Sequence, residues 1–171
     1  IDTYKSKKLD GDVGKPHPAF ASLVAGMDKS LNDLLNHLEK SAEAENTLIF
    51  FLGDNGSAAP IKHPKKGANA SSPLRNKKGS CYEGGMRVPF IAAWAKVNPQ
   101  NPLQKQFPIA INAHTTTAFA TIEDLMPSIL KLTGTPAPSK HIMDGVNILP
   151  ALAKANTKTG RTHFLMHFPH S

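Results

Sequence analysis

The feature that most constrains the fold is an apolar run that ends abruptly in polar residues. Residues 47–52 read TLIFFL, and Gly-Asp-Asn-Gly follows at once. An apolar run without alternation is typical of a central strand covered on both faces. Ligands of open α/β sheets bind outside the carboxyl ends of the strands, so Asp54 and Asn55 are expected at a functional edge.

A helix is predicted immediately before this strand. From Pro18, apolar residues recur at helical spacing for roughly twenty residues, with charged and amide side chains between them. The apolar stripe comprises Phe20, Leu23, Val24, Met27, Leu31, Leu34, Leu35 and Leu38. An amphipathic helix that leads into a buried strand favours the α/β class.

The rest of the chain alternates loops with short elements. Residues 53–85 are rich in Gly, Pro, Ser, Asn and Lys. This stretch is too long for a passive connector, and long loops of this kind usually carry function. Further elements are predicted as a strand within 86–97, a helix within 121–135 that stops at Gly134, a short helix within 144–155 and a last strand at 161–168. The pattern predicts a sheet with functional loops at its strand ends.

Charge narrows the classes of partner. The 171 residues carry a formal net charge of +7, with basic clusters at 5–8 and 62–78. These clusters lack interleaved aromatic residues and a helix-turn-helix pattern, so an anionic substrate is favoured over nucleic acid. No apolar run reaches eighteen residues, so no membrane span is expected. The single cysteine, Cys81, excludes an internal disulfide and a multi-cysteine zinc site, and we expect it to be a small packed side chain.

Asp54 and Asn55 have two interpretations when considered alone. Carboxylate and amide oxygens suit a hard cation such as calcium or magnesium, whereas zinc would favour His or Cys. Asp-Asn-Gly is equally a favoured turn sequence, and these three residues alone favour the turn.

A second segment changes that balance. Residues 71–90 read SSPLRNKKGSCYEGGMRVPF. Together with LIFFLGDNG, this segment closely resembles the C-terminal half of the catalytic domain of the sulfatase family, within the alkaline-phosphatase-like superfamily. The resemblance continues through MDKSLNDLLNHLE, IEDLMPSILKLTG, DGVNILPAL and HFLMHFPH, and so covers nearly the whole chain. It implies a mixed, mostly parallel sheet flanked by helices, incomplete in this chain.

The resemblance also implies site residues. Asp54 and Asn55 would ligate the divalent cation, usually calcium, with magnesium as the alternative, and Lys78 would reach the sulfate group. Lys78 is preferred over Lys77 because it directly precedes the glycine of KKG. His63 and His114 are secondary candidates for substrate contact.

The segment Tyr82–Arg87 is expected to support the site without doing chemistry. Its glycines would permit positive φ, and Arg87 would pair with a nearby carboxylate or with carbonyl groups.

The family's formylglycine nucleophile arises in a Cys-x-Pro-x-Arg type motif that this sequence lacks, since Tyr-Glu-Gly-Gly follows Cys81. Residues 1–171 are therefore expected to be the C-terminal portion of a sulfatase catalytic domain. The nucleophile-bearing N-terminal part and the small C-terminal domain would be absent. Alone the chain would lack activity and would need the remainder of the polypeptide. Its substrate would be a sulfated small molecule or saccharide, and the family's location implies a periplasmic or secreted protein.

Three alternatives remain open. A phosphatase or phosphotransferase of the same superfamily would share the metal-bearing sheet, although zinc-dependent relatives carry histidine where Asn55 stands. A non-catalytic module could bind anionic glycans through the basic loop. A zinc site on His163, His167 and His170 is disfavoured, because on a strand His163 and His167 would share one face with Leu165 rather than form a cluster.

Overall fold

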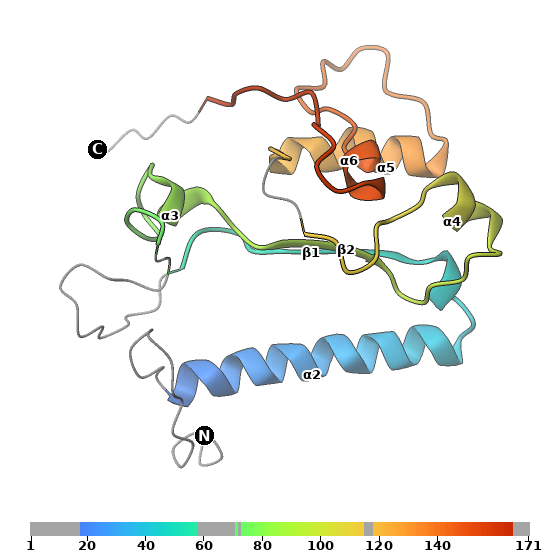
Figure 1. The fold of residues 1–171 in the computed structure, drawn as a ribbon, viewed down its shortest axis with the longest axis horizontal. Helices are drawn as coiled ribbons and strands as arrows, with labels where there is room; N and C mark the ends of the chain where they lie inside the picture. The colour runs from blue at the N-terminus through green and yellow to red at the C-terminus, as the bar shows by residue number, and fades with distance from the viewer. Residues whose placement is uncertain (1–17, 58–70, 72, 115–117, 166–171) are drawn as a thin grey trace. The chain divides into compact units, whose positions relative to one another are not determined.

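The computed structural model describes residues 18–57, 71, 73–114 and 118–165. The elements follow one another as α2 (Pro18–Lys40), η1 (Ala44–Asn46), β1 (Leu48–Leu52), α3 (Glu83–Met86), β2 (Phe90–Trp94), α4 (Pro102–Gln106), η2 (Ile122–Asp124), α5 (Leu125–Thr133) and α6 (Leu149–Ala153) (Figure 1). The described residues form two compact units. The first contains residues 18–42 and 50–91, and the second contains 43–49 and 92–165.

β1 and β2 pair side by side, as Figure 1 shows. Gly53 N–H donates to Pro89 O at 3.2 Å at one end, and Ala95 N–H donates to Thr47 O at 2.9 Å at the other. Residue numbers therefore run in opposite directions, so the pair is antiparallel, as a mixed sheet allows. The start of β2 consequently lies at the same end of the pair as the loop that follows β1.

The strands predicted at 47–52 and within 86–97 are confirmed, but β1 differs from the expected central strand. Every residue of β1 is half-buried rather than buried, and in the described part of the chain β2 is its one neighbour. Phe50 stacks on Phe90 with ring centroids 6.0 Å apart, which joins the two strands through their side chains.

The first unit begins with α2, which confirms the helix predicted from Pro18. It spans 23 residues, and an ion pair of 2.5 Å joins Lys29 to Asp33 one turn later. Several residues of its apolar stripe are exposed, including Phe20, Leu23, Met27 and Leu34. The periodicity thus predicts the helix correctly, while much of its apolar face stays open to solvent.

The core of the second unit gathers around β2 and α6. Trp94, Ile148, Leu149 and Ala151 are buried, and Trp94 Nε1 donates to the carbonyl of Phe107 at 3.2 Å. α4 was not predicted. Its signal is the dipeptide Asn-Pro at 101–102: the Asn101 side chain accepts from Leu103 N–H at 2.9 Å, and proline takes the first helical position.

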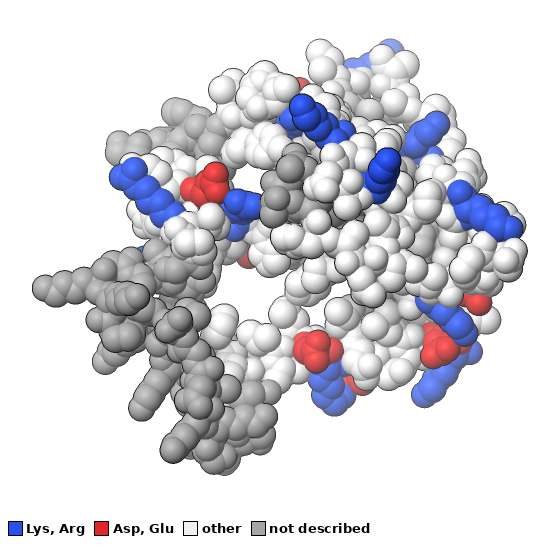
Figure 2. All heavy atoms as spheres, viewed as in Figure 1, with Lys and Arg blue, Asp and Glu red and all other residues white. Residues whose placement is uncertain are grey.

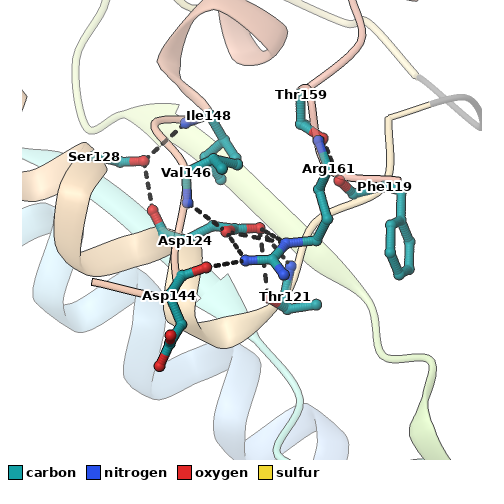
Figure 3. Close-up of polar contacts among 9 residues, drawn as sticks. All are labelled: Phe119, Thr121, Asp124, Ser128, Asp144, Val146, Ile148, Thr159 and Arg161. Atoms are coloured by element: carbon teal, nitrogen blue, oxygen red, sulfur yellow. Dashed lines mark hydrogen bonds and ion pairs between the residues drawn. The ribbon is translucent and has the colours of Figure 1, made fainter. Parts of the chain in front are cut away.

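α5 follows η2 and ends at Gly134, as predicted, with a left-handed φ of +67°. At its start lies Asp124, whose side chain is fully buried. The carboxylate accepts hydrogen bonds from Thr121 N–H at 2.8 Å, Val146 N–H at 2.8 Å and Arg161 Nη2 at 2.6 Å (Figure 3). Burial by itself would raise the pKa of Asp124, but the hydrogen bonds from Arg161, Val146 and Thr121 outweigh it and lower the pKa.

The last predicted strand is wrong for residues 161–165, which carry no strand; residues 166–168 lie outside the described part. The alternation of RTHFL resembles a strand, yet its N-terminal residue is held by side-chain bonds. Arg161 Nη2 also donates to Asp144 O at 2.9 Å, and no ladder to β1 or β2 forms. Within the described residues, no helix combines the length and the apolar character needed to cross a membrane.

Candidate functional site

Two loops of the first unit meet beyond the carboxyl end of β1. Gly56 N–H donates to Gly85 O at 2.8 Å, and Lys78 N–H donates to Ser57 O at 3.1 Å. These bonds join the Asp-Asn-Gly turn to the segment that leads into β2. The structure therefore brings together the two sequence segments that were singled out for a common site.

Glycines make this approach possible. A Cβ on Gly56 would lie 1.9 Å from Gly84 O, and one on Gly84 would lie 2.1 Å from Asn76 O. A Cβ on Gly85 would meet Ser80 O at 2.2 Å. Since all three contacts are with backbone oxygens, no side-chain movement could relieve them.

The expectation that Gly84 and Gly85 adopt positive φ is wrong. Both are buried within α3, and the positive angles in this loop belong to Gly79 at +87° and Asn76 at +66°. Close packing, rather than backbone handedness, requires glycine at 84 and 85.

Asp54 and Asn55 lie next to each other on the turn. Asp54 is exposed and Asn55 is half-buried, and the Asn55 amide nitrogen donates to Asp54 Oδ1 at 3.0 Å and to Gly56 O at 3.3 Å. The pair offers oxygen donors of the kind that a hard cation takes. A cation bound by both would need the Asn55 amide to turn its oxygen, instead of its nitrogen, toward Asp54.

The donor set around this pair is small. Within the described ranges, no three His, Cys, Asp or Glu side chains gather where they could hold a metal ion. Calcium prefers about six to eight oxygens. Asp54 and Asn55 thus fit a calcium or magnesium site in donor type, and would supply only a part of its ligands.

Lys77 and Lys78 are both exposed, and their backbones differ in what they contact. Lys78 N–H bonds the turn that carries the Asp-Asn pair, whereas Lys77 N–H bonds Asn76 Oδ1 at 3.0 Å and Lys77 O accepts from Ser80 Oγ at 2.9 Å. Only Lys78 is tied directly to the turn. The preference for the Lys78 side chain over that of Lys77 stays a prediction.

The residues around these lysines hold the loop in shape. Arg87 pairs with Glu83 at 3.3 Å, which confirms the expected carboxylate partner. Sequence reasoning missed Arg75, whose guanidinium carbon lies 3.7 Å from the centre of the Tyr82 ring. Ser71 Oγ donates to Gly84 O at 2.8 Å. Cys81 is exposed, so its interpretation as a packed side chain is wrong.

Of the histidines considered as site residues, the structure describes only His114 and His163. His63 lies outside the described residues, as do His167 and His170. His114 is exposed and belongs to the second unit, so its part in substrate contact stays a prediction. His163 is exposed and its Nδ1 lies 3.0 Å from Thr162 Oγ1.

On the face shown in Figure 2, Lys and Arg side chains of the described residues are scattered among uncharged ones. The predicted basic cluster at 5–8 and residues 62–70 of the second cluster lie outside the described residues, so the preference for an anionic substrate over nucleic acid stays a prediction.

Comparison with known proteins decides the family. The family model described as Sulfatase matches residues 2–135. The chain belongs to the sulfatase family. It is 33% identical to an N-acetylgalactosamine-6-sulfatase of Canis lupus familiaris over 78% of this chain and 23% of the relative. It is 30% identical to a sulfatase of Formosa agariphila over 97% of this chain and 29% of the relative.

The fold agrees with this family. The crystal structure of Ps i-CgsB in complex with k-i-k-neocarrahexaose matches with a TM-score of 0.64 and 28% identity, over 88% of this chain and 29% of that one. The sulfatase chain therefore has the mixed α/β fold predicted for it, the alkaline-phosphatase-like fold. It spans about a quarter of the length of these relatives.

Proposed function

We propose that this sulfatase chain supplies two metal ligands and one sulfate-binding lysine to a sulfuric-ester hydrolase. The observation that carries the proposal is the pair of backbone bonds, Gly56 to Gly85 and Lys78 to Ser57. They hold an oxygen-donor pair and a lysine on two connected loops at the carboxyl end of β1.

In this proposal Asp54 and Asn55 hold calcium, with magnesium as the alternative. The bound cation would supply positive charge beside the sulfate oxygens. Lys78 would place its ammonium against a non-bridging oxygen of the ester, where negative charge grows as the nucleophile attacks sulfur. The loop contacts around Gly56 fix the backbone that carries these groups, so little reorganisation is needed when substrate binds.

Residues 1–171 act, in this proposal, as the C-terminal portion of the catalytic domain. The nucleophile, a formylglycine, would come from elsewhere in the polypeptide, because the sequence holds no Cys-x-Pro-x-Arg motif. The chain alone would be inactive and would bind calcium weakly. Calorimetry with calcium tests this point: micromolar binding that Asp54→Ala abolishes would mean that the site is complete in this chain.

The proposed substrate is a sulfated saccharide, and the proposed location is periplasmic or secreted. Support for the substrate comes from relatives named for N-acetylgalactosamine 6-sulfate chemistry and from the neocarrahexaose complex of the structural neighbour. The protein that carries this chain, co-expressed with a formylglycine-generating enzyme, should hydrolyse an aryl sulfate and sulfated saccharides. Hydrolysis of phosphate esters alone would favour the phosphatase alternative. A parent sequence without a nucleophile motif would favour the glycan-binding module.

The role of Lys78 is tested against its neighbour. Lys78→Ala should lower kcat by about a hundred- to a thousandfold, which is typical when one preorganised donor to a developing charge is lost. Lys77→Ala should have a much smaller effect, because an exposed lysine loses mainly screened attraction. Thermal melting of both variants checks that the loop stays folded. Equal activities, or the reverse order, would contradict the assignment.

A further inference from the structure

The second unit contains a hollow of about 280 Å³ that the proposed catalytic residues do not use. Among the described residues, Phe119 and residues 158–162 line it. The Thr159 hydroxyl donates a hydrogen bond to the carbonyl of Phe119, forty residues away in sequence. Arg161 N–H in turn donates to Thr159 Oγ1 at 3.3 Å. Figure 3 shows these three residues side by side.

Arg161 fixes the base of this wall. Its guanidinium bonds the buried carboxylate of Asp124 through Nη2 at 2.6 Å and the carbonyl of Asp144 at 2.9 Å. Arg161 is itself largely buried, with 12% of its side chain exposed. Its charge is thus already paired, and the hollow holds its shape without a ligand. Such preorganisation lowers the entropy cost of binding.

Phe119, which lines the hollow, forms an aromatic pair with Phe164. The rings of Phe119 and Phe164 lie 5.5 Å apart with an interplanar angle of 37°, and each residue is more than a third exposed. Aromatic rings bury much apolar area when a ligand covers them, so their exposure leaves binding energy available. The C–H face of a pyranose ring is a flat apolar partner of suitable size for such a ring.

Lys158 gives the same hollow a positive charge. Its side chain is exposed, and no ion pair joins it to a carboxylate within the part of the chain that the structure describes. The Thr159 and Thr162 hydroxyls add polar groups to the wall. A lysine ammonium is a compact point charge that suits a sulfate or carboxylate substituent. An aromatic face, hydroxyls and one cation therefore meet at one place, which a sugar bearing an anionic group would match.

We propose that this hollow is a binding subsite for one sulfated sugar unit, with the ring over Phe119 and the sulfate at Lys158. The proposal rests on the proposed function, in which the substrate is a sulfated saccharide. Ligand pockets usually span about 300–1,000 Å³, so a hollow of about 280 Å³ suits a single unit. The subsite would bind one sugar unit and would not take part in the chemistry.

Calorimetry with galactose 6-sulfate as the probe tests the subsite. The protein that carries this chain should be used with Lys78→Ala, which weakens binding at the proposed active site. In that background Lys158→Gln should weaken binding about tenfold, as expected for one charge-assisted contact. Phe119→Ala should weaken binding of both galactose 6-sulfate and galactose. Lys154→Gln is the matched control: it also removes an exposed lysine, but one that does not line the hollow, and should change nothing.

Several outcomes would overturn the subsite. One is an unchanged affinity in both Lys158→Gln and Phe119→Ala; Lys158 is exposed, so loss of fold would not obscure that result. Inorganic sulfate binding as tightly as galactose 6-sulfate would show an anion site without sugar recognition. Aryl-sulfate hydrolysis is measured in parallel on the parent protein. If the parent protein hydrolyses the aryl sulfate but Lys158→Gln and Phe119→Ala leave sugar binding unchanged, only the subsite proposal is overturned. If the two variants weaken sugar binding but the parent protein does not hydrolyse the aryl sulfate, only the hydrolase proposal is overturned.

Discussion

Replacing Arg161 with methionine should destabilise the protein strongly, because it leaves a buried carboxylate short of its main partner. Asp124 is 0% exposed, and Arg161 reaches it through Nη2 at 2.6 Å and through Nε at 3.1 Å. Three donors would remain: the backbone N–H groups of Thr121 and Val146, each at 2.8 Å, and the Thr121 hydroxyl at 3.5 Å. They satisfy hydrogen-bonding capacity but do not neutralise the charge.

Removing one partner of a buried ion pair costs about 3–5 kcal/mol of unfolding free energy. At about 2–4 °C per kcal/mol for a chain of this size, a loss of about 3 kcal/mol lowers Tm by about 6–12 °C. Methionine keeps most of the aliphatic length of arginine, so packing loss is small. Thermal unfolding followed by circular dichroism measures the shift.

Arg87→Met is the matched control for Arg161→Met. Arg87 also pairs with a carboxylate, but both partners are more than half exposed and the contact is 3.3 Å. An exposed pair contributes about 1 kcal/mol or less. Equal Tm shifts in the two variants would refute the reasoning that burial decides the cost. The double variant Asp124→Leu, Arg161→Met should not recover stability, because the Thr121 and Val146 N–H groups would lose their acceptor.

Three further results are expected. The pKa of Asp124 is lowered by folding, so below about pH 4 the unfolded state binds more protons and stability should fall as pH falls; urea titrations across pH 2–6 should show a smaller fall in Arg161→Met. Gly56→Ala should lower the free energy of unfolding by about 1–3 kcal/mol, because its Cβ would meet Gly84 O at 1.9 Å; a melting curve like that of the parent would contradict this. Gly26→Ala should instead stabilise α2 by about 0.5–1 kcal/mol, since its Cβ would meet open space.

The candidate site could be predicted from sequence only in part. Asp54, Asn55 and Lys78 are predicted as site residues because each lies in a short motif of adjacent residues, and such a motif can be recognised in the sequence alone. The bonds from Gly56 to Gly85 and from Lys78 to Ser57 could not be found in that way. These bonds join two segments that are distant in sequence, and no residue pattern in the sequence indicates that the two segments meet. The need for glycine at 84 and 85 likewise depends on backbone oxygens that approach from other parts of the loop.

The secondary structure likewise separates into elements that the local sequence predicts and elements that tertiary contacts decide. Local spacing predicts α2, β1, β2, α6 and the stop of α5 at Gly134, because side-chain periodicity and positive φ are properties of neighbouring residues. The segment 161–165 has a strand's alternation but forms none, because a strand needs a partner and Arg161 bonds Asp124 instead. That bond spans 37 residues, and only the folded chain places the two charges together. The same tertiary contacts shape the hollow at Phe119, which no local pattern indicates.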